Sequence, residues 1–300
     1  MFSKSTWLHL RIPFSFYLMP VYLFGLGISP NFSEPRLIWS FIIIHLFLYP
    51  ASNGYNSYFD KDEGSIGGLE KPPPVNKGLY YTSLLFDGIA IVLGFITISV
   101  LFAVMLFIYG LASKAYSHPS VRLKKFPFGG LATVAFFQGF FTFLLCYVGI
   151  NDFGLENLWS AKVLIPASLS SLLLIGTYPM TQIYQHEEDG KRGDRTISLM
   201  LGVKGTFVFV LLIFSVAAIG YVLYFNAFYL LQYGLAFLLF LGPVVIYFLN
   251  WFYRVVKDPT KANHRNTMRL NFISALCLNA FFVYFFLDSS QVLQAIRGGY

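Results

Sequence analysis

Long apolar runs are the feature that most limits how this chain can fold. Runs of about 17–24 apolar residues recur from one end to the other, and a helix of that length crosses a hydrocarbon core of about 30 Å. With 56% hydrophobic residues, 12% charged residues and a mean hydropathy of +0.63, the chain is typical of an integral membrane protein. We predict an all-α, polytopic bundle of about nine transmembrane helices near residues 12–28, 37–59, 79–95, 98–115, 130–150, 163–184, 206–224, 231–250 and 270–287.

The boundary between the third and fourth predicted spans depends on one short segment. Within the apolar stretch 79–115, the sequence "GFITIS" at 94–99 offers the break that separates two helices. Without a helix end there, the two spans would merge and eight would remain. The number matters because it decides on which side of the membrane the C-terminus lies.

The basic residues predict the orientation of the bundle. With a cytoplasmic N-terminus and nine spans, the inner loops hold all of the 21 Lys and Arg residues except Arg36, Lys162 and Arg297, as the positive-inside rule requires. The net charge of +7 then reflects topology and attraction to anionic membrane lipid, and we expect no nucleic-acid partner. These charges predict a multi-pass protein of a bacterial inner membrane, with the C-terminus outside.

A polar motif occurs twice in this otherwise apolar chain. "YPASNGYNSYFDKDEG" at 49–64 and "YPMTQIYQHEEDGKRG" at 178–193 match in register, and each ends in a run of charged residues. In the predicted topology, both copies lie at the cytoplasmic ends of helices, the second and the sixth. Internal duplication of this kind predicts a single transmembrane domain. Its repeat halves would be roughly 1–128 and 129–300.

Each copy of the motif carries a stripe of polar residues at helical spacing. Residues three and four apart share one helix face, and polar side chains that faced lipid would be costly, so we expect both stripes to face one cavity. Pro50 and Pro179 should kink or open the two helices beside it. The stripes comprise His45, Tyr49, Ser52, Asn53, Asn56 and Asp60 in the first copy, and Tyr178, Thr181, Gln182, Gln185 and Asp189 in the second.

Oxygen ligands for a metal ion are concentrated at the charged end of each copy. Asn56 precedes Asp60 by four residues, and Gln185 precedes Asp189 by four, so each pair presents an amide and a carboxylate on one helix face. An all-oxygen set is typical of Mg2+, whose shell phosphate oxygens can complete. A solvated acidic patch is the alternative for a single copy, whereas two copies in register favour the metal site. Asp62, Glu63, Glu187 and Glu188 add further oxygens nearby.

Three loops on the predicted cytoplasmic side supply cations for phosphate groups. Arginine suits bidentate phosphate contacts, and lysine suits point-charge contacts. The sequence has neither a Walker A motif nor G-x-G-x-x-G before a helix, which disfavours an ATP-driven pump. A hydrophobic molecule that carries a diphosphate fits better, with its tail between the helices. The candidate cations are Lys71, Lys114, Arg122, Lys124, Lys125, Lys191, Arg192 and Arg195.

Three motifs, in the same order, resemble those of the UbiA-type intramembrane prenyltransferases. "NSYFDKDEGSIGG" at 56–68 resembles the first signature of that family, in the spelling common among naphthoate prenyltransferases. "HEEDGKRGDRTISLMLG" at 186–202 is similar to the second signature. "YSHPSVRLKKFPFGGL" at 116–131 resembles the loop after the fourth helix and the start of the fifth. The resemblance covers nearly the whole chain.

The resemblance implies an activity and a set of site residues. The implied reaction is Mg2+-dependent transfer of an isoprenyl chain from its allylic diphosphate to a hydrophobic acceptor, aromatic or a quinone precursor, in a central cavity that opens sideways to the bilayer. By position, Asn56 and Asp60 would bind one Mg2+, and Asp189 with Glu188 or Glu187 the other. The diphosphate would contact Lys71, Arg122, Lys124 and Arg192, and Tyr116 would support it or the departing bridging oxygen.

Two positions depart from the pattern of this family. Gln185 stands where many members carry Asp, so the second metal set would contain an amide instead. The first signature usually has a further downstream Asp, where this chain has Gly64 and Ile66. Asp62 or Glu63 would substitute for that acid.

Asp87 joins Asp60, Asp189 and Tyr116 as a candidate catalytic residue. It lies within the predicted span 79–95, and an isolated carboxylate inside the membrane usually marks a pathway or a partner. The alternative is a hydrogen-bonded interior Asp with a structural role.

Two other classes of function remain open. The same diphosphate chemistry would serve a terpene cyclase, or a transferase to a lipid or sugar phosphate. A repeat-built transporter of an anionic or lipid substrate is the third possibility. The acidic clusters disfavour transport, because we expect them at the inner face of the membrane rather than midway through broken helices.

Overall fold

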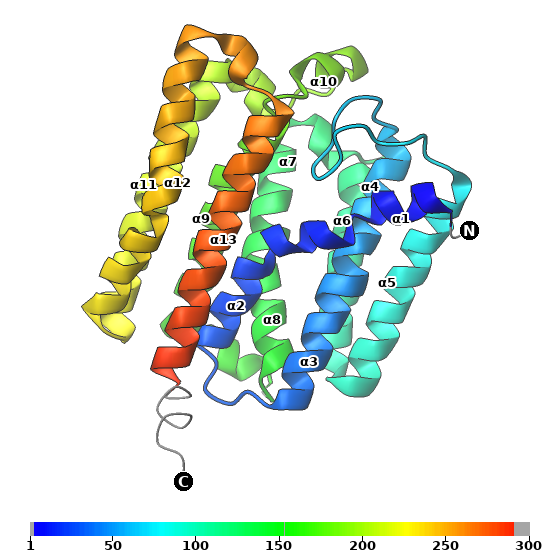
Figure 1. Cartoon of the computed structure of the whole chain (residues 1–300). Helices are drawn as coiled ribbons and strands as arrows, with labels where there is room; N and C mark the ends of the chain where they lie inside the picture. The colour runs from blue at the N-terminus through cyan, green and yellow to red at the C-terminus, as the bar shows by residue number, and fades with distance from the viewer. Residues whose placement is uncertain (1–2, 153, 291–300) are drawn as a thin grey trace.

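Figure 1 shows the computed structural model of the chain, which describes residues 3–152 and 154–290. Within these ranges the regular elements are all helices. Eight helical segments there are long and apolar enough to cross a membrane, and a bent pair of helices near the N-terminus raises the number to nine. The predicted all-helical membrane architecture is therefore confirmed.

The eight spans lie side by side in Figure 1, and two of them contain a π-helical segment in the middle. They are α3 (Glu34–Ile42) with the π-helix η2 (Ile43–Leu48) and α4 (Tyr49–Asp60), α5 (Lys77–Thr97), α6 (Val100–Ser117), α7 (Pro127–Thr133) with the π-helix η4 (Val134–Phe141) and α8 (Thr142–Ile150), α9 (Ala161–Gln182), α11 (Ile197–Phe228), α12 (Leu231–Lys257) and α13 (His264–Ser289).

The first predicted span, 12–28, is bent rather than straight. After α1 (Lys4–Leu10), the 3-10 helix η1 (Ile12–Tyr17) runs across the bundle, and α2 (Met19–Gly27) turns along it. The bend between the two parts is 41°. Arg11 ends α1 in the left-handed region at φ 46°, and prolines occupy the first turns of both η1 and α2. Because proline lacks an N–H group, a new helix begins at each of these positions.

The break expected between the third and fourth spans is present. α5 ends at Thr97, and α6 begins at Val100. Ser99 caps the new helix, because its hydroxyl accepts a hydrogen bond from the N–H of Phe102 at 3.2 Å. The stretch 79–115 therefore contains two membrane-spanning helices.

The two π-helical segments place irregular backbone beside the interior of the bundle. η2 ends directly before Tyr49 and Pro50, and Pro50 has no N–H to continue a regular ladder. In η4, the hydroxyl of Ser171 from α9 donates to the carbonyl of Ala135 at 2.6 Å and accepts from the N–H of Phe140 at 3.1 Å. This side chain pairs backbone groups that the widened turn leaves free.

The second copy of the polar motif does not form one continuous helix. α9 ends at Gln182, and a separate short helix, α10 (His186–Arg192), carries Asp189. The expectation that Gln185 and Asp189 extend the stripe of the sixth span is therefore wrong. Three acidic residues fall in the first turn of α10, where the helix dipole favours negative charge, and this local preference starts a new helix. The repeat halves remain a prediction.

The loops near α10 complete the charged end of the bundle. The short 3-10 helix η3 (Leu123–Lys125) lies between α6 and α7. The N–H of Arg195, after α10, donates to the carbonyl of Lys125 at 3.0 Å. Two further 3-10 helices, η5 (Leu155–Trp159) and η6 (Pro259–Lys261), lie in other connections.

Candidate active site

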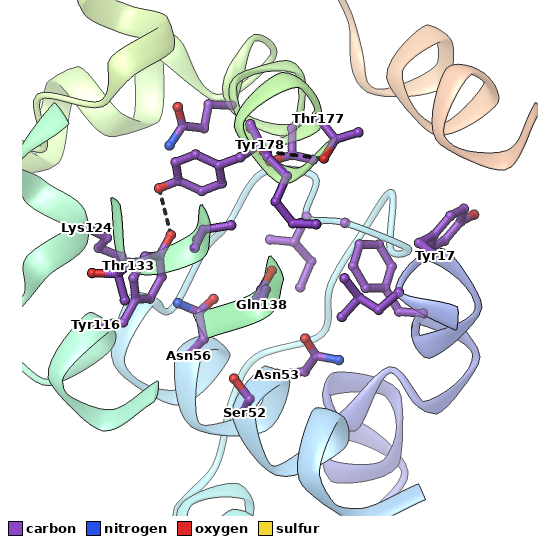
Figure 2. Close-up of a pocket in the computed structure, with 18 of the residues that line it drawn as sticks. Tyr17, Ser52, Asn53, Asn56, Tyr116, Lys124, Thr133, Gln138, Thr177 and Tyr178 are labelled. Carbon is purple, nitrogen blue, oxygen red and sulfur yellow. Dashed lines mark hydrogen bonds between the residues drawn. The ribbon is translucent and has the colours of Figure 1, made fainter. Parts of the chain in front are cut away.

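A cavity of about 280 Å³ lies inside the bundle, at the ends of α4 and α9 that carry the two motifs. Its deeper walls are mainly apolar, with Tyr109 and Gln138 among the polar exceptions, and the walls nearest the loops carry charged and amide side chains. Figure 2 shows Ser52, Asn53 and Asn56 of α4 on one side and Tyr178 of α9 on the other. The apolar lining includes Val134, Phe137, Leu173, Leu174, Ala275 and Leu278, and the polar lining includes Asn56, Asp60, Asp62, Lys124, Gln185, Asp189, Arg192 and Asp194.

Asp60, at the end of α4, contacts two cations of the loop before α7. Lys124 forms an ion pair with Oδ2, and Nη2 of Arg122 lies 3.5 Å from Oδ1. The side chain of Asp60 is 4% exposed, so both cations neutralise a buried carboxylate. The motif of the first repeat copy is thus joined to "SHPSVRLKK", which lies about 60 residues further along the chain.

Arg192 joins the second copy of the motif to the first. Its guanidinium group contacts Asp62 through Nη1, and Nη2 lies 2.8 Å from Oδ1 of Asp189. Its Nε lies 3.3 Å from Oδ2 of Asp194. Asp194 in turn makes a bidentate pair with Arg122, at 3.0 and 2.8 Å. Four carboxylates and three cations therefore form one continuous network at the charged end of the cavity.

Burial and charge act differently on the two carboxylates after α9. Burial raises the pKa of Asp189 to about 6, and the hydrogen bond and charge of Arg192 offset only part of that effect. Burial would also raise the pKa of Asp194, but the hydrogen bonds from Arg122 and the nearby charges of Lys124 and Arg192 outweigh it, so the pKa is lowered. The carboxyl group of Asp194 therefore stays ionised at neutral pH, whereas the pKa of Asp189 lies closer to neutral pH.

A pair of tyrosines lies beside this network. The hydroxyl groups of Tyr116, on α6, and Tyr178, on α9, are hydrogen-bonded at 2.8 Å (Figure 2). Gly130 makes room for them, because a Cβ atom there would lie 2.8 Å from the hydroxyl of Tyr178. Both rings line the cavity, so one hydroxyl can orient the other towards a bound group.

The two amides of the motifs hold positions in the same cavity. Asn56 donates through Nδ2 to the hydroxyl of Ser117 at 3.0 Å, and Gln185 donates through Nε2 to the carbonyl of Ser65 at 3.3 Å. Each amide uses its N–H for the protein. This arrangement leaves the amide oxygen as the acceptor that can serve a ligand.

The comparison with protein families identifies the fold. The model of the UbiA prenyltransferase family matches residues 17–276. The chain belongs to the UbiA prenyltransferase family. No curated protein sequence matches it. The family resemblance expected from the three motifs is confirmed, and the family is one of intramembrane prenyltransferases.

Solved structures show the same fold as this UbiA-family chain at low sequence identity. A UbiA homolog from Archaeoglobus fulgidus bound to DMAPP and Mg2+ superimposes with a TM-score of 0.66 at 16% identity, covering 94% of this chain and 99% of the other. The same homolog bound to GPP and Mg2+ gives 0.65 at 18% identity, over 94% and 99%. A digeranylgeranylglyceryl phosphate synthase gives 0.61 at 19% identity, over 94% and 98%.

The carboxylate and amide oxygens at the charged end of the cavity are of the kind that binds Mg2+, although the carboxylates contact Arg and Lys side chains in this structure. Within residues 3–152 and 154–290, no group of three or more His, Cys, Asp or Glu side chains is arranged to hold a metal ion. The carboxylates contact Arg and Lys instead. Oδ1 of Asp60 is buried and accepts no hydrogen bond from the described residues. A buried carboxylate oxygen without such a hydrogen bond, in the same cavity as the amide of Asn56, fits a hard cation.

Five of the predicted site residues do not line the cavity of this UbiA-family chain: Lys71, Glu63, Glu188, Asp87 and Arg122, the last of which contacts the cavity residues Asp60 and Asp194. Lys71 is exposed on the loop between α4 and α5. Glu63 is also exposed, and its N–H donates to Oε1 of Glu188 at 3.0 Å, so these two acids meet outside the cavity. Asp87, on α5, forms an ion pair with Lys114 of α6. This contact corresponds to the structural alternative for Asp87.

Two charged cavity residues were not predicted as site residues from the sequence. Arg11 lines the cavity and donates to the carbonyls of Gly67, at 3.1 Å, and Asn53, at 3.4 Å. Asp194 lies within a run of basic residues, "KRGDR". An acid surrounded by cations was the available signal for Asp194, since such a residue is favoured where several arginines converge.

Proposed function

We propose that this UbiA-family chain transfers an isoprenyl chain from an allylic diphosphate to a hydrophobic acceptor, aromatic or a quinone precursor, within the membrane and with Mg2+. The observation that carries the proposal is the network of carboxylates and cations at one end of a cavity whose deeper walls are mainly apolar. A diphosphate head would occupy the charged end. The isoprenyl tail would lie along Phe137, Leu173 and Leu278.

The same network offers partners for both the diphosphate and the metal. Lys124, Arg122 and Arg192 would bind phosphate oxygens. The carboxylates of Asp60 and Asp189 would then be free for Mg2+. Mg2+ would be held by Asn56, Asp60, Gln185 and Asp189, and when bound it would stabilise negative charge on the departing diphosphate. Because cations and carboxylates are already in place, little reorganisation is needed as that charge develops.

The transfer step breaks one bond and forms one. The bond between the allylic carbon and the bridging oxygen breaks, and its electron pair leaves with the diphosphate. The hydroxyl of Tyr116, oriented by Tyr178 at 2.8 Å, would donate a hydrogen bond to that oxygen. The acceptor forms the new bond to the allylic carbon and releases a proton. The apolar walls exclude water that would otherwise capture the carbon.

The terpene cyclase and the transferase to a lipid or sugar phosphate use the same site and differ in product. A transporter would move its substrate without breaking it. The decisive experiment therefore incubates the purified protein in lipid nanodiscs with isoprenyl diphosphates of ten, fifteen and twenty carbons, with and without Mg2+, and measures diphosphate release. Membrane extracts supply candidate acceptors, and mass spectrometry separates alkylated acceptors from cyclic hydrocarbons. Failure to release diphosphate with every substrate and extract would refute the proposal.

A further inference from the structure

The carboxylate of Asp194 lies between two arginines that come from different loops. Nε and Nη2 of Arg122 donate to its two oxygens at 3.0 and 2.8 Å. Nε of Arg192 lies 3.3 Å from Oδ2 of the same carboxylate. In the described part of the chain, it is the carboxylate that both arginines share. Its side chain is 4% exposed and lines the cavity.

The backbone fixes Asp194 relative to both arginines. Its N–H donates to the carbonyl of Asp189 in α10 at 2.9 Å, and the N–H of the next residue, Arg195, donates to Lys125 of η3 at 3.0 Å. Gly193 makes the turn before it with φ 76°, a conformation that favours glycine. The carboxylate therefore stays in place when either guanidinium group takes up a ligand.

Two guanidinium groups repel each other unless an anion separates them. The hydrogen bond to Asp194 favours the charged form of Arg122 and raises its pKa, whereas the charge of Arg192 opposes it. We propose that Asp194 is a positioning residue, which holds Arg122 and Arg192 together so that the substrate diphosphate meets both charges at one place. The inference rests on the proposed function, because it assigns these arginines to a diphosphate.

A purely neutralising role for Asp194 predicts the opposite change in diphosphate affinity when Asp194 is removed. If Asp194 only neutralised the site, its removal would take away a negative charge beside an anion-binding site, and diphosphate would bind more tightly. If Asp194 positions the arginines, its removal lets them separate, and diphosphate binds more weakly. The direction of the change in affinity therefore distinguishes the two roles.

The test measures binding of inorganic pyrophosphate with Mg2+ to the full-length protein in nanodiscs by calorimetry. For Asp194→Asn we expect the dissociation constant to rise about tenfold, and KM for an isoprenyl diphosphate to rise more than kcat falls. The control is Asp152→Asn, which removes the partner of Arg36 at 2.6 Å, at the other end of the α3–η2–α4 span. Its affinity should stay within about twofold of the wild type. Equal or tighter pyrophosphate binding by Asp194→Asn would overturn the proposal.

Two further variants keep the proposal testable. If Asp194→Asn does not fold, Asp194→Glu keeps the charge but displaces it by one methylene group, and the same loss of affinity is expected. Wild-type affinity in that variant would overturn the proposal. In an Arg122→Gln background, Asp194→Asn should weaken binding little further, whereas fully additive losses would contradict the inference. Pyrophosphate binding needs no turnover, so an inactive wild type would refute the proposed function separately.

Discussion

Arg192 and Asp62 are in contact although 130 residues separate them. The contact joins the charged ends of the two polar motifs above one cavity. Since Arg192 also contacts Asp189 at 2.8 Å, a single guanidinium group neutralises carboxylates from both copies. The two motifs therefore act as parts of one site, and substitutions in either copy should affect the same chemistry.

Removing the central carboxylate of either copy should nearly abolish turnover. Asp60→Ala and Asp189→Ala each remove a proposed Mg2+ ligand. The first also leaves Lys124 without its ion-pair partner, whereas Arg192 keeps Asp62 and Asp194 when Asp189 is removed. We expect diphosphate release to fall by about a hundredfold or more, with folded protein still obtained by size-exclusion chromatography. Asp258→Ala, at the exposed pair with Lys261, is the control. Full activity in either site variant would remove the proposed metal site.

Gln185→Asp should strengthen metal binding. The substitution places a second carboxylate four residues before Asp189, in the cavity, and a charged ligand holds Mg2+ more strongly than an amide. We expect the Mg2+ concentration for half-maximal diphosphate release to fall several-fold. Gln185→Asn, which keeps the amide, serves as the control. A higher Mg2+ requirement in the Asp variant would point to a different ligand geometry.

Tyr116→Phe should slow the reaction without weakening substrate binding. The variant loses the hydroxyl that is hydrogen-bonded to Tyr178 and proposed to contact the bridging oxygen. The loss of one such hydrogen bond in the transition state corresponds to about a tenfold lower kcat. Tyr178→Phe retains the Tyr116 hydroxyl and should have a smaller effect. An equal fall for both variants, or an unchanged kcat for Tyr116→Phe, would argue against this role.

Asp87→Ala should destabilise the protein through Lys114. The two side chains form an ion pair between α5 and α6, with exposures of 12% and 21%, and an unpaired charge in that position costs about 3 kcal/mol. We expect a lower unfolding midpoint and largely retained turnover per folded molecule. The double variant Asp87→Leu/Lys114→Met removes both charges and should recover stability. Loss of turnover in this folded double variant would restore Asp87 as a catalytic candidate.

Gly139→Ala should loosen the contact between η4 and α9. A Cβ atom at this position would lie 2.5 Å from the Cα atom of Ser171, so the two backbones must separate, at a cost of about 1–3 kcal/mol. The unfolding midpoint in detergent measures this change. Gly88→Ala is the matched control, because a Cβ atom there has no described atom within 4 Å. Equal midpoints for both variants would contradict the close helix crossing.

Several features followed from local sequence patterns. Apolar length predicted the spans, and "GFITIS" predicted the break that Ser99 caps. The three motifs predicted the family. The repeat predicted that Asn56, Asp60, Gln185 and Asp189 surround one cavity, and all four line it, although Gln185 and Asp189 follow the end of α9 instead of extending its stripe. These predictions succeed because helix length, capping and face depend on residues close together in the chain.

Other features depended on contacts between distant segments. The end of α9 at Gln182, the pairing of Asp87 with Lys114 and the placement of Glu63 with Glu188 outside the cavity have no unique local signal. The position of Asp194 between Arg122 and Arg192 likewise requires the loops before α7 and after α10 to meet.

The sequence by itself therefore determined a helical membrane bundle, its family and the residue types of the proposed diphosphate and metal site. Only the tertiary structure decided which carboxylate each cation neutralises and which charged residues reach the cavity. The physical reason is that a helix is specified by neighbours within one or two turns, whereas a buried ion pair is specified by the distance between side chains that the whole bundle brings together.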